Sequence, residues 1–279
     1  MPDHEAGIHG TTLASGSDDA GLHGVRSAAR VPVSPELLEK LHLASRTDAG
    51  HVRKTFANPT PIPMAGFVLS LTPLSMHLMG WRGVGGSGAA GIPVYYFQGG
   101  LLMVVGALLE WILGNTFPAV VFSVFGSFWL AYAGILNANA NAAAPLAQST
   151  STDDFNTTVA CWFLFMGVLC FLFLICSLRT NVVFFAIFLS LVLAFALLTG
   201  AFLLKAEAGP ANAARVDRLL VGAGATSFVT ALGGWYILLA LLLAAVDFPL
   251  RIPVGDLSTV VKGKSDAQKN ETVPSGGRT

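Results

Sequence analysis

Charged side chains are scarce in this sequence. Asp, Glu, Lys and Arg make up 11% of the 279 residues, and hydrophobic residues make up 53%. A soluble globular domain carries about 25% charged residues, so the composition indicates an integral membrane protein. The formal net charge is zero, which leaves no positive excess for binding nucleic acid. We therefore expect a lipid bilayer, and no nucleic acid, among the partners of this chain.

Cysteine is also scarce. The three cysteines, Cys161, Cys170 and Cys176, fall in one hydrophobic segment, a placement with neither a disulfide framework nor the spacing of a zinc site. Phosphate-binding loops and redox motifs are missing as well. We therefore expect that the protein is not an enzyme and that it has no catalytic residue, cofactor or metal ligand. No hydrophobic core precedes residue 60, so the sequence predicts no cleavable signal peptide.

Long hydrophobic runs, in contrast, are plentiful. Each of the segments approaches or exceeds the roughly 20 residues that a helix needs to cross the hydrocarbon of a bilayer. The six segments cover residues 61–80, 93–113, 117–137, 156–178, 181–204 and 219–246. The expected fold is an all-α integral membrane protein with six transmembrane helices.

The flanking regions differ in composition from the hydrophobic region 58–246. Residues 1–57 are rich in Gly, Ala, Ser, His and Asp without a sustained apolar period, which predicts a disordered tail. Residues 247–279 are polar and form a second tail. An even number of spans places both termini on one side of the membrane, and Lys and Arg are slightly more frequent on that side. The positive-inside rule then predicts that both tails are cytosolic.

The entry to the first hydrophobic segment has an unusual sequence, Asn58, Pro59, Thr60 and Pro61. Proline is tolerated at the start of a helix, where the first N–H groups have no intrahelical partner, and Asn58 is a good candidate for the N-cap. The unpaired donors of such an end can receive an anion. The simpler alternative is that Asn and Pro only begin the helix.

Glu110 is the one carboxylate expected within a span. A charged side chain at membrane depth is costly, which makes it a functional candidate. Alternatively, because Glu110 precedes the end of its helix by one turn, it can reach the N–H groups of the Asn115–Thr116 turn and fix the hairpin. We prefer this second, structural role.

Two further polar side chains lie in the early spans. His77 is a candidate for proton handling, although its place near the outer end of the first span also suits contact with lipid headgroups. Gln98 precedes two glycines, and it either lines a pathway or bonds to a neighbouring helix. We prefer the packing role for both. With so few charges inside the spans, the sequence by itself indicates a six-helix channel or carrier for a small, weakly charged solute.

Several motifs are more specific than the composition. Asn58–Pro59–x–Pro61 is followed by Gly66–Phe67, and the ending Ile252–Pro253–Val254–Gly255 comes just after the last span. Between them lie Phe97–x–Gly99–Gly100, Gly106–x–Leu108–Leu109–Glu110, Gly114–Asn115–Thr116–Phe117, Gly126–Ser127–Phe128–Trp129 and Phe195–Ala196–Leu197–Leu198. Together they resemble the acetate uptake transporter family, also called succinate–acetate permeases, over about residues 58–256. The long polar N-terminal tail is similar to the fungal branch.

The resemblance implies a homo-hexameric, channel-like assembly in the plasma membrane. Each subunit would carry its own pathway for acetate and similar short carboxylates, with succinate as a further candidate. Several members behave as proton-coupled carriers. The family's hydrophobic constriction falls, by motif position, on Phe67, Phe125 and Leu191. This chain departs from the family at Phe125, where relatives can have Tyr, at Pro63, where Gly is usual, and at Met64, where Leu is usual. We expect these departures to affect selectivity more than fold.

Two other functions remain open. Some fungal relatives have been linked to ammonia export, and the altered Pro63 position leaves room for transport of ammonium. The second alternative is that the chain acts as an acetate-responsive membrane sensor that signals through its N-terminal tail.

Overall fold

The computed structural model describes residues 56–84, 89–140, 152–207, 210–250 and 252–257. All of them belong to one compact unit, Arg53–Thr279. Nearly all of the predicted N-terminal tail and most of the predicted C-terminal tail lie outside the described residues, so the predictions for both tails stay predictions.

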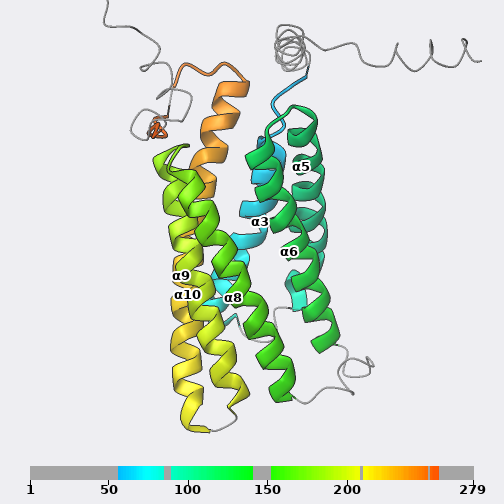
Figure 1. Ribbon diagram of the computed structural model, residues 1–279, viewed down its shortest axis with the longest axis vertical. Coiled ribbons are helices and arrows are strands. Elements are labelled where there is room, and N and C mark those ends of the chain that lie inside the picture. Colours follow the sequence, from blue (N-terminus) through cyan, green and yellow to red (C-terminus); the bar gives the residue numbers. More distant parts are fainter. Residues whose placement is uncertain (1–55, 85–88, 141–151, 208–209, 251, 258–279) are drawn as a thin grey trace, which may run out of the picture. The chain divides into compact units, whose positions relative to one another are not determined.

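The described part of the chain is helical (Figure 1). Six helical segments are long and apolar enough to cross a membrane, which confirms the predicted all-α fold with six spans. The first is α3 (Pro61–Leu78), followed by the short 3-10 turns η1 (Trp81–Gly83) and η2 (Ala89–Gly91). The second span is a continuous run of α4 (Ile92–Val94), the π-helix η3 (Tyr95–Leu102) and α5 (Met103–Ile112). The other four are α6 (Thr116–Ala140), α8 (Thr152–Ser177), α9 (Val182–Ala206) and α10 (Pro210–Ala245).

Some helices extend beyond the hydrophobic segments. Helix α10 begins at Pro210, whereas the hydrophobic segment begins at residue 219, and α6 continues to Ala140, whereas the hydrophobic segment ends at residue 137. Hydropathy reports the part of a helix that suits lipid, but alanine and arginine also favour helix in water. Proline suits the first turn of α10 because it needs no partner for an N–H group.

Helix α3 lies between two groups of helices. It packs against α10 on one side and against η3 and α5 on the other, while α8 packs against α9, α9 against α10, and α5 and η3 against α6 (Figure 1). The contact with η3 is very close, because a Cβ atom added at Gly66 would lie 2.3 Å from the carbonyl oxygen of Gln98. Gln98 is thus half-buried in a π-helix at the α3 contact.

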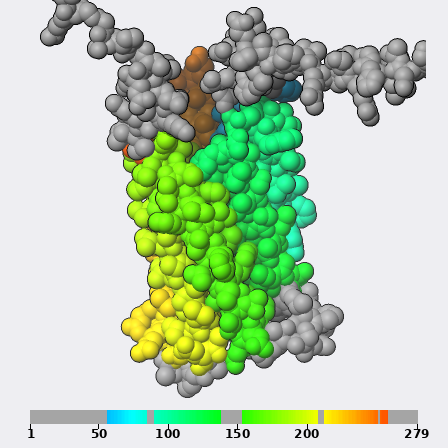
Figure 2. Space-filling view, viewed as in Figure 1, coloured from blue at the N-terminus to red at the C-terminus, as the bar shows by residue number. Residues whose placement is uncertain are grey.

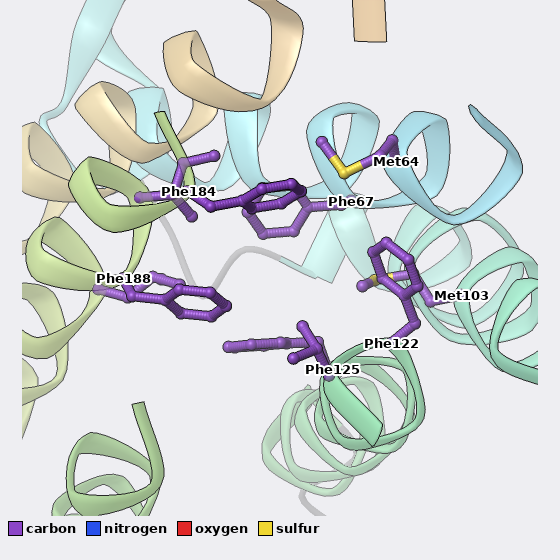
Figure 3. A pocket seen from close by; sticks show the side chains of 10 residues that line it. Met64, Phe67, Met103, Phe122, Phe125, Phe184 and Phe188 are labelled. Atoms are coloured by element: carbon purple, nitrogen blue, oxygen red, sulfur yellow. The ribbon is translucent and has the colours of Figure 1, made fainter. Parts of the chain in front are cut away.

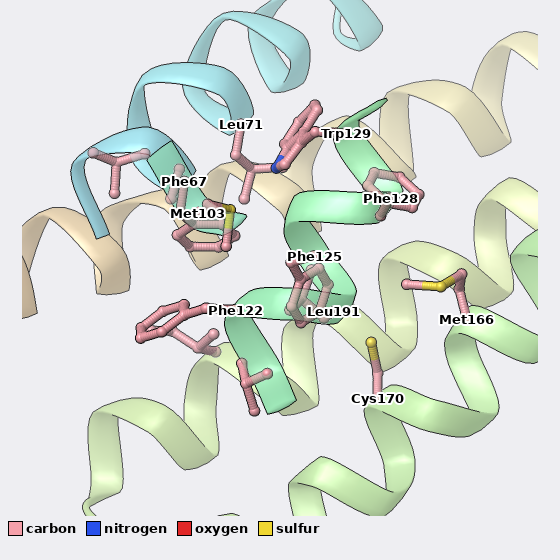
Figure 4. Close-up of a cluster of buried hydrophobic side chains, with 14 of the residues drawn as sticks. Phe67, Leu71, Met103, Phe122, Phe125, Phe128, Trp129, Met166, Cys170 and Leu191 are labelled. Atoms are coloured by element: carbon pink, nitrogen blue, oxygen red, sulfur yellow. The ribbon is translucent and has the colours of Figure 1, made fainter. Parts of the chain in front are cut away.

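Aromatic side chains dominate the interior between these helices. Phe128 of α6 stacks on Trp162 of α8 at 5.0 Å between ring centroids, and it meets Phe195 of α9 edge-on at 5.5 Å. Figure 4 shows Phe128, Trp129 and Phe125 within this core. The outward side chains of α8, which crosses the face seen in Figure 2, are apolar too and include Leu164, Phe165, Val168, Phe171, Leu172 and Ile175. This surface suits lipid or a neighbouring subunit.

The segment after α10 returns to the bundle. The N–H of Val182 donates to the carbonyl of Gly255 at 2.8 Å, and the N–H of Leu257 donates to the carbonyl of Thr180 at 3.0 Å. The Tyr236 hydroxyl donates to the carbonyl of Pro253 at 2.7 Å. Residues 252–257 are therefore fastened to the turn between α8 and α9.

Candidate transport pathway

Three cavities follow one another between the helices. The first, which we call the inner cavity, has a volume of about 20 Å³ and lies among Met64, Phe67, Phe125, Phe188 and six further apolar side chains (Figure 3). The second, the middle cavity, has a volume of about 30 Å³. Each has room for about one or two water molecules, since a cavity needs about 10–15 Å³ of such volume to hold one.

The inner and middle cavities share the residues that we predicted as the constriction. Phe67 of α3, Phe125 of α6 and Leu191 of α9 line both cavities, and their exposed fractions are 6%, 4% and 4%. The rings of Phe67 and Phe125 lie 6.3 Å apart between centroids, and Figure 4 shows both side chains with Leu191 in the interior. We call these three side chains the apolar neck. An opening of this kind is closed to a continuous column of water.

The third cavity, the outer cavity, is much larger, with a volume of about 310 Å³. It shares Leu74, Leu78, Phe128 and Leu198 with the middle cavity, so the three cavities form one row. His77, near the end of α3, lines the outer cavity. His77, for which we preferred a packing role over proton handling, therefore faces a cavity.

Glu110 lies at the opposite end of α3 and is fully buried. Its Oε1 accepts a hydrogen bond from the Thr60 hydroxyl at 2.5 Å, and its Oε2 accepts one from the side-chain amide of Asn115 at 2.5 Å. The hairpin contact that we predicted is present in a different form, because the Asn115 backbone N–H donates to the carbonyl of Glu110 at 2.9 Å and not to its carboxylate. Thr116, also named in that prediction, is exposed as the first residue of α6.

The start of α3 differs from the predicted entrance. The cap is Thr60 rather than Asn58. Asn58 forms a turn of its own, in which its Oδ1 accepts from the Thr60 N–H at 3.1 Å and from the Thr60 hydroxyl at 2.7 Å, the habit of Asn side chains in turns.

The backbone donors in the first turn of α3 are already used. Pro61 and Pro63 have no N–H group, while Ile62 donates to the carbonyl of Pro59 at 3.0 Å and Met64 donates to that of Thr60 at 3.2 Å. Every donor we expected to point at an anion is absent or paired. The role of residues 58–61 as a substrate entrance therefore depends on the resemblance alone.

Sequence reasoning missed most of the lining. In the inner cavity it missed the second aromatic layer of α9, Phe184 and Phe188, and in the outer cavity it missed the polar residues Asn156 and Lys205. A phenylalanine in a hydrophobic span and a lysine at its end give no spacing signal that separates them from lipid-facing or interfacial residues. Gln98 and Glu110 line none of the three cavities.

These features define the class of protein: a multi-pass helical membrane protein with a row of cavities inside one subunit. The chain belongs to the GPR1/FUN34/yaaH family, whose sequence pattern matches residues 45–259. That span contains every motif on which the resemblance to acetate uptake transporters rested.

Individual relatives agree with this assignment. The chain is 43% identical to Protein alcS of Aspergillus fumigatus over 266 residues, which cover 92% of this chain and 97% of the relative. It is 31% identical to Acetate transporter protein patA of Aspergillus clavatus over 201 residues, 72% of this chain and 78% of the relative. It is 29% identical to Acetate permease A of Emericella nidulans over 224 residues, 78% and 72% of the two chains. The predicted resemblance to acetate transporters, rather than to enzymes, is confirmed.

A solved structure supports the fold. The bacterial acetate channel SatP matches this chain with a TM-score of 0.58 and 24% sequence identity, covering 72% of this chain and 99% of SatP. The six-helix core is therefore the fold of that channel.

Proposed function

We propose that this protein transports acetate and similar short-chain carboxylates, with succinate as a further candidate, across a membrane through the row of cavities in each subunit. One observation carries the proposal: Phe67, Phe125 and Leu191, from three different helices, line both cavities at the narrow part of the row. The names of the patA and Acetate permease A relatives support acetate as the substrate.

We also propose that transport is coupled to protons through the apolar neck. An unpaired carboxylate that leaves water for an apolar site pays far more than a neutral acid does. Because the neck offers no polar group, it favours the protonated acid, and the proton then travels with the substrate. Glu110 as a proton relay is the rival explanation. It is less well supported, since Glu110 is bonded to Thr60 and Asn115 and lines none of the three cavities.

The departures from the family pattern affect different surfaces. Met64 lines the inner cavity, so this change alters the space that a substrate meets. Pro63 packs against α5, where a Cβ atom added at Gly106 would lie 2.4 Å from the proline ring. Phe125 removes a hydroxyl from the neck. We therefore expect Met64 and Phe125, more than Pro63, to set the substrate range.

The proposal extends to assembly and location. We propose a homo-hexamer in the plasma membrane, with residues 58–246 in the bilayer and both tails in the cytosol. The six candidate spans support a common side for the termini, because the start of α3 and the end of α10 lie at the same end of the bundle (Figure 1).

The test is uptake of labelled acetate into liposomes that contain the purified protein, with and without an imposed proton gradient. We expect uptake that rises with an inward proton gradient. The variant Phe67→Ala should widen the neck, raise the flux and weaken its dependence on the gradient. Flux that ignores the gradient in the unmodified protein would indicate a passive anion channel.

Absence of acetate flux from correctly assembled protein would refute the proposal. Ammonium would then be the next substrate to test, since Ammonia transport outward protein 3 of Saccharomyces cerevisiae is 32% identical over 126 residues, although these cover only 45% of this chain and 44% of that protein. The sensor hypothesis depends on a tail outside the described residues, and deletion of residues 1–50 tests it: a transporter keeps its flux, whereas a sensor loses its output.

A further inference from the structure

The outer cavity differs in chemistry from the rest of the row. The inner and middle cavities are lined by apolar side chains except for Ser227, whereas His77, Tyr132, Asn156 and Lys205 line the outer one. They come from four helices, α3, α6, α8 and α9. Polar side chains that converge on a cavity of about 310 Å³ are the usual setting of a small-molecule site.

Asn156 is the most informative of these residues. It is only 9% exposed, and within the described part of the chain its side-chain amide makes no hydrogen bond. Among the described residues, the buried side-chain polar atoms without a partner are the Ser70 hydroxyl and the Trp129 indole nitrogen, so the Asn156 amide is in reach of water. Since Asn156 lines the cavity, its amide is available there to water or to a ligand.

Lys205 provides a positive charge at the same cavity. Its Nζ lies 4.7 Å from the centroid of the Phe202 ring, and Phe202 also lines the cavity. An ammonium group over an aromatic face is held there by cation–π attraction. Asp217 of α10 is near enough to attract Lys205, but it does not line the cavity, so the charge that faces a ligand is that of the lysine.

The acidic groups nearby do not cancel this arrangement. Asp153 and Asp154 lie in the first turn of α8, just before Asn156, and both are exposed. Neither lines the cavity. Their negative charges weaken the long-range attraction of an anion to the cavity, and salt screens this effect. The contacts of a bound anion with Lys205 and Asn156 are short-range and are screened less.

We propose that the outer cavity is a binding site for the carboxylate anion, occupied before the substrate reaches the neck. Lys205 pairs with the carboxylate, the Asn156 amide donates a hydrogen bond to it, and His77 offers a second donor. The apolar wall of Leu74 and Leu198 receives the hydrocarbon tail and leads to the middle cavity. This proposal deepens, and rests on, the proposed transport of carboxylates.

The volumes assign the site a broader ligand range than the neck. About 310 Å³ accommodates monocarboxylates of several carbons and small dicarboxylates, whereas the inner and middle cavities, at about 20 and 30 Å³, admit acetate only when their side chains move. Binding at the outer cavity therefore selects for a negative charge, and the neck selects for size and for the protonated form.

The test is equilibrium binding of carbon-13-labelled acetate to the purified full-length protein, measured by NMR saturation transfer. We expect Lys205→Gln to weaken acetate binding by about two- to fivefold, the range that corresponds to a partly exposed ion pair. The matched control is Arg215→Gln, which removes an exposed charge from the same end of the bundle outside the cavity lining and should leave binding unchanged. Acetamide, an uncharged analogue of acetate, should bind equally to all three proteins.

A second variant, Asn156→Ala, should weaken binding of both acetate and acetamide, because both accept a hydrogen bond through oxygen. Equal acetate affinity in the unmodified protein and Lys205→Gln overturns the proposal, as do equal losses in Lys205→Gln and Arg215→Gln, or no acetate binding at all.

The liposome flux distinguishes this proposal from the proposed function. If acetate binding depends on Lys205 but no flux is measured, the result supports the binding site and refutes transport. If the flux changes in Phe67→Ala but acetate affinity is the same in Lys205→Gln as in the unmodified protein, the result supports transport and refutes the site.

Discussion

Helix α3 begins and ends among polar side chains, but the two groups differ in their hydrogen bonding. At its start, each oxygen of the Glu110 carboxylate accepts a hydrogen bond, one from Thr60 and the other from Asn115. At its end, the Asn156 amide lines the outer cavity and makes no hydrogen bond within the described residues. A polar group that the fold satisfies contributes to stability, whereas one that the fold leaves open is available to a ligand. Burial alone does not separate the two, since Glu110 is the more deeply buried.

The largest effect on stability is expected at the satisfied end. Glu110→Ala removes the carboxylate that accepts hydrogen bonds from the Thr60 hydroxyl and the Asn115 amide. The loss of both bonds should lower the free energy of unfolding by about 3 kcal/mol. Thermal unfolding of the purified protein, followed by tryptophan fluorescence, measures this. The control is Glu207→Ala, at an exposed glutamate after α9, which should change little. Normal stability together with loss of gradient-driven uptake would instead identify Glu110 as a proton relay.

A smaller effect on stability is expected for Thr60→Val, which keeps the shape of the side chain and removes the hydroxyl that Glu110 and Asn58 share as a donor, a loss of about 1.5 kcal/mol. Because Thr60 and Glu110 act in one network, the loss in the double variant Thr60→Val with Glu110→Ala should be less than the sum of the single losses. Strict additivity in the same unfolding measurement would contradict the shared network.

At the open end, Asn156→Ala should change the free energy of unfolding by less than about 0.5 kcal/mol, since no intramolecular hydrogen bond is lost. The same variant should bind acetate less tightly. A large loss of stability would mean that Asn156 supports the fold, and the contrast between the two ends of α3 would then disappear.

The smallest effect is expected for His77→Gln. Glutamine preserves a hydrogen-bond donor at the edge of the outer cavity, so acetate affinity should change by less than about twofold. A larger loss in the NMR binding measurement would assign His77 a direct role in holding the carboxylate.

The parts of this structure that the sequence predicts well are those that local patterns determine. Hydropathy gives the six spans, because each span must satisfy its own backbone hydrogen bonds in lipid. Motif position predicted Phe67, Phe125 and Leu191 as the constriction. The structure places all three on the two small cavities, and their role in transport stays a prediction.

The contacts that could not be predicted join segments far apart in the chain. The Thr60 partner of Glu110 lies 50 positions away, and no spacing rule reaches so far. Asn156 gave no sign of facing a cavity, because its neighbours on α9 and α10 come much later in the sequence. The prediction of free backbone donors at the start of α3 was wrong for a local reason that the sequence shows. Pro63 has no N–H group, and the first turn of the helix uses the other donors.

The fastening of residues 252–257 to the turn between α8 and α9 has a practical consequence for work on this protein. The tie at Val182 and Gly255 lies only two residues before Phe184, whose ring lines the inner cavity. A chain shortened after residue 257 retains that tie, whereas a chain shortened before residue 252 releases the first turn of α9. Fluorescent fusions and affinity tags at the C-terminus should therefore be attached beyond Leu257. The hydrogen bonds of residues 252–257 then separate the tag from Phe184 and the inner cavity.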